Sequence, residues 1–232
     1  MIAHETRLTA LDFVCPDVVV GTVRRPEGYE FAAGQWFRLS IETPEGTQTR
    51  TLSHASAPAD EDLDFATRLS DSAFKRALAG MSPGDPVAIA GPGGRLALPE
   101  GWTRAVMLVG GVGITPVRSL LRDMAARGRS VEEALVIYGN REPSCAPFAA
   151  ELEELSGHGV RVVDVFETAP DGFDCERGFI TAELLRRHGV APDGRPFLVA
   201  GPPPMVAAME RVLDELGVAL SDRRIERFGP AA

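Results

Sequence analysis

The chain has 232 residues, 44% of them hydrophobic, which is enough to build two modest hydrophobic cores. Its formal net charge of −9 and pI near 5.0 argue against a nucleic-acid partner, because phosphate binding requires a basic surface. The chain contains no run of about 18 apolar residues, so no membrane-spanning helix is predicted. Residues 1–13 are polar where a secretory signal would be apolar, which favours a cytoplasmic location.

The N-terminal part of the chain has the pattern of an antiparallel β-structure. Residues 6–98 contain short runs of β-branched or alternating residues, separated by Gly and Pro. The strands predicted in this way are 18–23, 36–41, 47–51, 63–69 and 86–90, and one helix is predicted at 72–79. The spacing of these strands predicts an antiparallel β-barrel.

After Trp102 the pattern changes to near-continuous apolar runs that alternate with helical periodicity. Strands are predicted at 105–109, 134–138, 160–166 and 197–200, and helices at 117–124, 148–155, 180–188 and 205–213. Such alternation predicts parallel strands that are covered on both faces and joined by right-handed crossovers. We place the boundary near residues 99–103, which gives a barrel domain over 1–100 and an α/β parallel-sheet domain over 101–232.

Three features carry chemistry. Arg50 and Ser53 lie at the end of a polar strand, where a guanidinium can bind a phosphate. The glycine-rich turn 110–113 follows a buried strand and precedes a helix, which is the position of a phosphate-binding turn. Arg141 follows the next strand, where an arginine accommodates a 2′-phosphate and an acidic residue favours NAD. Glu142 and Glu167 lie nearby in sequence, so the choice between NADH and NADPH stays open.

Four short segments together resemble the ferredoxin–NADP reductase family. They are Arg50-Thr51-Leu52-Ser53, Gly110-Gly111-Val112-Gly113-Ile114-Thr115-Pro116, Gly201-Pro202-Pro203-Pro204-Met205 and Glu226-Arg227-Phe228. The chain departs from the family motifs at two positions, with Leu52 in place of a Tyr and Ala200 in place of a Cys. The resemblance covers nearly the whole chain and implies an FAD-binding barrel followed by an NAD(P)-binding domain.

The resemblance also implies the site residues. For the flavin these are Arg50, Thr51, Leu52, Ser53, Arg68, Ser72, Ala73, Phe74 and Phe228. For the nicotinamide nucleotide they are Gly110, Gly111, Gly113, Thr115, Pro116, Asn140, Arg141, Gly201, Pro202, Pro203 and Met205. The implied catalytic residues are Ser53, Glu226 and Phe228, with Phe228 covering the flavin ring and Glu226 handling protons or poising the site. No metal site is predicted.

The implied function is an FAD-dependent NAD(P)H oxidoreductase. Because a plant-type iron–sulfur cluster needs four thiolates and the chain has three scattered cysteines, the electron acceptor is expected to be a separate ferredoxin, an oxygenase component or another redox protein. Two alternatives remain: a free-flavin or quinone reductase, and a non-enzymatic flavin-binding sensor or adaptor. The sequence does not determine the oligomeric state.

Overall fold

The structure is a computed structural model that describes residues 2–229, and the chain divides into two compact units. The first unit contains the residues up to Arg95 together with Thr115–Ala126, and the second contains Leu96–Ile114 and the residues from Arg127 onward. The grouping of Thr115–Ala126 with the first unit was not expected from the sequence. Within residues 2–229, no helix is both long enough and apolar enough to cross a bilayer.

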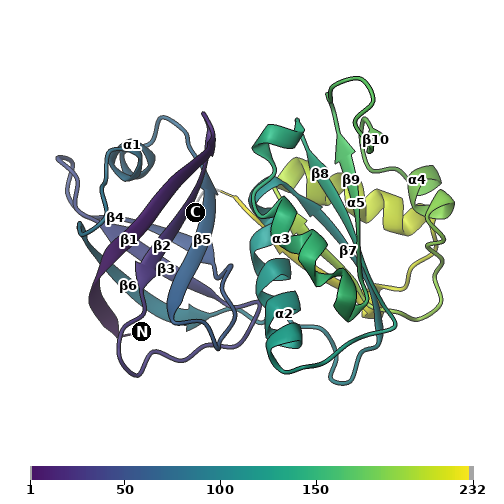
Figure 1. The fold of residues 1–232 in the computed structure, drawn as a ribbon, viewed down its shortest axis with the longest axis horizontal. Helices are drawn as coiled ribbons and strands as arrows, with labels where there is room; N and C mark the ends of the chain where they lie inside the picture. Colours follow the sequence, from purple (N-terminus) through teal and green to yellow (C-terminus); the bar gives the residue numbers. More distant parts are fainter. Residues whose placement is uncertain (1, 230–232) are drawn as a thin grey trace. The chain divides into compact units, whose positions relative to one another are not determined.

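The first unit is built on a six-stranded antiparallel sheet with the order β4-β3-β6-β1-β2-β5 (Figure 1). Its strands are β1 (Ala3–Cys15), β2 (Val18–Arg24), β3 (Trp36–Ile41), β4 (Gln48–Ser53), β5 (Asp62–Arg68) and β6 (Pro86–Gly93). The sheet curls so that its two edge strands meet, and the Ala55 N–H donates to the Asp64 carbonyl at 2.8 Å. The predicted barrel is therefore confirmed.

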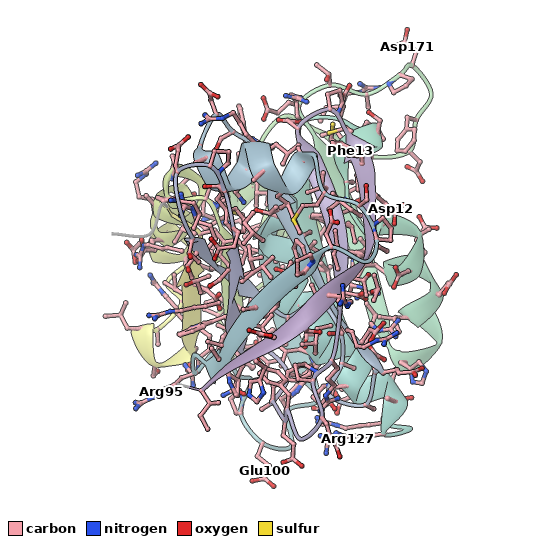
Figure 2. All side chains as sticks on the ribbon, turned by 90° about the vertical axis from the view of Figure 1, so that its left-hand side faces the viewer. Asp12, Phe13, Arg95, Glu100, Arg127 and Asp171 are labelled. Atoms are coloured by element: carbon pink, nitrogen blue, oxygen red, sulfur yellow. The ribbon has the colours of Figure 1, made fainter. Side chains whose placement is uncertain are left out.

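The core of this unit follows from the alternation of side chains along its strands. In β3, Phe37, Leu39 and Ile41 point inward and are at most 2% exposed, as a period of two requires. Helix α1 (Ala73–Ala79) buries Phe74 and Leu78 against the same core. Strand β1 was not predicted, and it is long enough to pair with both β2 and β6. Asp12 and Phe13 lie together toward one end of β1 (Figure 2), and Phe13 is 54% exposed.

The second unit contains a six-stranded parallel sheet with the order β10-β9-β8-β7-β11-β12 (Figure 1). Its strands are β7 (Arg104–Gly110), β8 (Glu133–Asn140), β9 (Val160–Phe166), β10 (Glu176–Arg177), β11 (Phe197–Gly201) and β12 (Arg223–Arg227). The helices that follow these strands in sequence are α2 (Ile114–Ala126), α3 (Ala149–Glu154), α4 (Ala182–Arg187) and α5 (Pro203–Glu215). The predicted α/β fold class is confirmed.

The central strands of this sheet are fully apolar in their interiors. Every residue from Ala105 to Val109 and from Phe197 to Ala200 has no exposed surface, because both faces of the sheet are covered. Charged residues collect instead at the amino ends of the strands, where the guanidinium of Arg195 contacts Glu133 at 3.0 Å and Asp193 at 2.6 Å. The hydrogen bond from Arg195 holds the pKa of Asp193 well below its usual range.

The segment that carries Glu226 and Phe228 is ordered by pairing with the parallel sheet. Residues Arg223–Arg227 form strand β12, which pairs in parallel with β11 over its full length. The Phe228 N–H then donates to the Gly201 carbonyl at 2.8 Å. Apolar periodicity gave no signal for β12, since four of its five residues are charged.

Candidate functional site

Strand β4 presents the predicted flavin segment in two environments. Arg50 is half-buried, and its guanidinium donates to the Thr49 carbonyl at 2.7 Å and lies 5.4 Å from the centre of the Phe74 ring. Thr51 is exposed, whereas Leu52 is 7% exposed and packs in the apolar core. Ser53 is 6% exposed. The side chain of Leu52, which stands in place of the family Tyr, is therefore committed to the core.

Helix α1 begins next to this strand, with which it is in contact. Ser72 is the N-cap residue, and its hydroxyl accepts from the Lys75 N–H at 3.4 Å. The carboxylate of Asp71 instead binds Arg76 at 2.9 Å. Because the Phe74 ring is fully buried, this residue has only its backbone available to a cofactor. Ala73 is partly exposed.

Arg68, the remaining predicted flavin residue, ends strand β5. Its guanidinium lies 3.6 Å from the Asp17 carboxylate, and 57% of its side chain is exposed. An exposed pair of this kind contributes little to stability, so Arg68 can exchange its partner for an anionic ligand at small cost.

His54, which directly follows Ser53, is a buried residue that the sequence analysis did not single out. Its ring has no exposed surface and stacks on Phe31, with 3.8 Å between ring centres. Nε2 lies 3.2 Å from the Tyr29 hydroxyl, while Nδ1 is buried without a hydrogen-bond partner. Burial, helped by the nearby charge of Arg25, lowers the pKa of His54 to about 3. The residue is therefore a neutral part of the core at physiological pH.

Polar side chains on α2 fix the segment that follows this motif, which sequence reasoning also missed. The guanidinium of Arg118 is 4% exposed and donates to the Ala55 carbonyl at 2.8 Å and to Asp64 at 3.0 Å. The hydroxyl of Ser119 donates to the Ser56 carbonyl at 2.7 Å. A buried arginine is costly unless it is paired, so these contacts hold the chain after Ser53 in one conformation. The sequence signal was a polar pair between the apolar residues Val117 and Leu120.

The glycine-rich turn of the second unit forms a short 3-10 helix, η1 (Gly111–Gly113), between β7 and α2. Gly111 has a φ of +54°, and a Cβ there would meet nothing within 4 Å. At Gly113 a Cβ would lie 2.2 Å from the Ala200 carbonyl oxygen. Gly111 is therefore the position open to a ligand, and Gly113 is required for close packing against β11. Thr115 and Pro116, which follow in α2, are buried.

The proline-rich segment continues directly from β11. Gly201 ends the strand, Pro202 caps α5 and Pro203 begins it, as a proline in the first helical turn should. A Cβ at Gly201 would lie 2.7 Å from the Met205 sulfur, and one at Gly110 would lie 3.2 Å from it. The two predicted nucleotide segments therefore contact each other through Met205.

The end of β8 carries the residues predicted to bind the adenine ribose. The side-chain nitrogen of Asn140 is buried and has no hydrogen-bond partner. The guanidinium of Arg141 lies 3.8 Å from the Glu142 carboxylate. The turn after β9 is hydrogen-bonded to the end of β8, since the Glu167 N–H donates to the Asn140 carbonyl at 3.2 Å. Asp171 lies at the tip of the loop that leaves β9 (Figure 2).

The strand register brings the predicted residues of the second unit to one edge of the parallel sheet. Gly110 lies beside Gly139, Ala200 lies beside Glu226, and the Phe228 N–H bonds Gly201. The carboxyl edge of a parallel sheet is the place where such folds bind nucleotides. The unpartnered amide of Asn140 and the open Gly111 turn suit a nucleotide, and the Arg50 guanidinium in the first unit suits a flavin phosphate.

Comparison with known proteins supports this arrangement. Residues 107–211 match the oxidoreductase NAD-binding domain. NADH-cytochrome b5 reductase 1 of Ajellomyces capsulatus is 28% identical over 79% of this chain and 64% of its own length, and that of Mortierella alpina is 31% identical over 59% and 47%. The chain thus spans about half to two thirds of these curated relatives.

Among solved structures, a ferredoxin NADP+ reductase from Neisseria gonorrhoeae with bound FAD and NADP superposes with a TM-score of 0.86. It is 26% identical, and the match covers 97% of this chain and 98% of that one. Sequence motifs, sheet order and this superposition agree. The chain therefore has the two-unit fold of the ferredoxin–NADP reductase-like proteins and contains an oxidoreductase NAD-binding domain over residues 107–211.

Proposed function

We propose that this chain is an FAD-dependent NAD(P)H oxidoreductase that passes electrons to a separate redox protein. The observation that carries the proposal is the carboxyl edge of the parallel sheet, where the η1 turn, Asn140 and the end of β12 lie together. Bound FAD supplies the redox chemistry, because it accepts a hydride and releases single electrons. The protein supplies binding and electrostatics.

The roles proposed for the residues follow from their chemistry. Arg50 binds a flavin phosphate, since a guanidinium forms charge-assisted hydrogen bonds to phosphate oxygens. The η1 turn binds the nucleotide pyrophosphate through backbone N–H groups next to Gly111. Ser53, Glu226 and Phe228 stay proposed catalytic residues. The parallel pairing of β12 supports the last two roles, because it fixes the backbone of the segment that carries Glu226 and leads to Phe228.

The residues at the carboxyl ends of β8 and β9 favour NADH over NADPH as the nucleotide. Arg141, which is suited to a 2′-phosphate, already contacts Glu142, and Glu167 follows in the adjoining turn. A 2′-phosphate would have to compete with these carboxylates. The curated relatives are likewise NADH reductases. We expect 5′-AMP to bind at least as tightly as 2′,5′-ADP in a calorimetric titration, and tighter binding of 2′,5′-ADP would reverse the assignment.

Two classes of acceptor have support. The curated relatives are named for cytochrome b5, a haem protein, and the gonococcal neighbour is named for ferredoxin. The ferredoxin expected from the sequence is not supported by the curated relatives, so we place a small haem protein first and an iron–sulfur protein second. Stopped-flow mixing of the reduced protein with a cytochrome b5 and with a plant-type ferredoxin would rank them by rate.

The test of the proposal is anaerobic addition of NADH, and then NADPH, to the purified protein while the flavin absorbance is recorded. We expect the protein to purify yellow and its flavin band to bleach. A colourless protein that turns over added flavin would favour the free-flavin reductase. A bound flavin that neither nucleotide bleaches would favour the non-enzymatic sensor or adaptor.

A further inference from the structure

The hydroxyl of Tyr138 lies between two backbone carbonyls near the carboxyl edge of the parallel sheet. Tyr138 lies on β8, beside Val109 of β7 and Asp164 of β9, and its side chain has no exposed surface. Its hydroxyl lies 3.3 Å from the Gly111 carbonyl oxygen and 3.0 Å from the Pro147 carbonyl oxygen, and it is the donor to both. A tyrosine hydroxyl carries one proton, so the two carbonyls share it.

Both carbonyls lie next to backbone in the left-handed region. Gly111 has a φ of +54°. Pro147 is followed by Phe148, whose φ of +63° is the only positive value among the non-glycine residues that the structure describes. Glycine adopts many conformations, and a bulky residue enters the left-handed region only where its neighbours hold it there. The Tyr138 hydroxyl therefore contacts the backbone at two places whose conformation the local sequence does not fix.

The hydroxyl is a permanent donor. Burial raises the pKa of Tyr138 well above its ordinary value, so the proton is kept at neutral and mildly alkaline pH. The Gly111 carbonyl also accepts from the Ile114 N–H, which is a bond within the turn. Loss of the hydroxyl would keep that internal bond and would remove the bond that joins the turn to β8. Tyr138 therefore acts on the position of the η1 turn, and the turn's own bond stays intact without it.

We propose that Tyr138 is a positioning residue for nucleotide binding and that it acts through the Gly111 peptide. The inference rests on the proposed function and goes beyond it, because it gives a role to a fully buried side chain outside the glycine-rich motif. The Gly111 carbonyl and the N–H that follows it belong to one planar peptide, so a bond that fixes the carbonyl also fixes the direction of that N–H. A turn held in one conformation before the pyrophosphate arrives binds it more tightly, because less freedom is lost on binding.

The test is Tyr138→Phe in the flavin-loaded full chain, mixed anaerobically with NADH in a stopped-flow instrument. We expect the dissociation constant for NADH to rise about fivefold, while the limiting rate of flavin reduction stays within about twofold of the wild type. ADP, which has the pyrophosphate but no nicotinamide, should lose affinity by a similar factor in a calorimetric titration. The matched control is Ile137→Val. Ile137 is the preceding residue of β8, is fully buried and faces the opposite side of the sheet, so its substitution loosens the core and should change neither dissociation constant.

A second measurement needs no substitution at Tyr138. The chain has two tyrosines, so fluorine NMR of protein labelled with 3-fluorotyrosine gives two resonances, which Tyr29→Phe assigns. Saturating ADP should shift the resonance of Tyr138. Wild-type affinity for NADH in Tyr138→Phe, equal losses in Tyr138→Phe and Ile137→Val, or a Tyr138 resonance that ADP does not move would overturn the proposal. A wild-type protein that binds no ADP and whose flavin neither NADH nor NADPH bleaches would instead overturn the proposed function.

Discussion

The two units bury polar groups in opposite ways. Eight polar or charged residues of the described chain are buried, and all except Arg195 belong to the first unit. The parallel sheet is covered on both faces, so its central strands β7 and β11 have apolar interiors. The curled antiparallel sheet instead holds His54, Thr67 and the contacts of Arg118 inside. The difference teaches that the buried histidine of the described chain, His54, belongs to the first unit.

The largest expected effect tests this contrast directly. The pKa of His54 is about 3 in the folded chain and about 6.5 in an unfolded one. Its contribution to stability is complete above pH 6.5 and is lost as the pH falls toward 3, by at most about 5 kcal/mol. Urea unfolding of His54→Phe should therefore depend less on pH in this range than the wild type. His158→Gln, a control in the second unit, should follow the wild type, and identical profiles for His54→Phe would refute the assignment.

The close contact between η1 and β11 is the equivalent weak point of the second unit. Because a Cβ at Gly113 would meet the Ala200 carbonyl oxygen, Gly113→Val should cost about 3 kcal/mol of unfolding free energy. Gly111→Ala adds a side chain in open space and should cost about 1 kcal/mol through its positive φ. The alanine variant should still weaken nucleotide binding. If both variants unfold at the same denaturant concentration, the packing role of Gly113 is wrong.

The next largest effect is expected at Arg50, the proposed contact to the flavin phosphate in the first unit. Arg50→Ala should weaken FAD binding by about 1.5 to 3 kcal/mol, because a charge-assisted hydrogen bond is lost. Flavin released on dialysis measures the effect. Arg38→Ala removes another surface cation of the same sheet and should retain its flavin. Full flavin occupancy in Arg50→Ala would remove this residue from the site.

The smallest expected effect concerns the end of β12. If Phe228 covers the flavin, as the family resemblance implies, nicotinamide has to displace the ring, and the displacement adds to the apparent cost of binding. Phe228→Ser should then lower the dissociation constant for NAD+ a few-fold while the protein keeps its flavin. An unchanged dissociation constant would leave Phe228 with a structural role only.

Hydrophobic periodicity was sufficient to locate strands that are buried on both faces of the sheet. The apolar runs of β7, β8, β9 and β11 were located to within two residues at each end, because a strand covered on both faces has no alternative pattern. Periodicity failed for β12, because four of its five residues are charged. This strand forms because its backbone pairs with that of β11. Neither did periodicity give the grouping of α2 with the first unit.

For the candidate site, the sequence by itself determined the local motifs: the Arg50 strand, the glycine turn and the proline-capped start of α5. These depend on neighbours in the chain, since phosphate turns and helix caps are set by a few consecutive residues. Only the tertiary structure decided that Gly113 is required for packing, that His54 is neutral and that the Tyr138 hydroxyl contacts the Gly111 carbonyl. Each of these properties depends on residues far away in sequence, and burial and electrostatic coupling arise only when the fold brings them together.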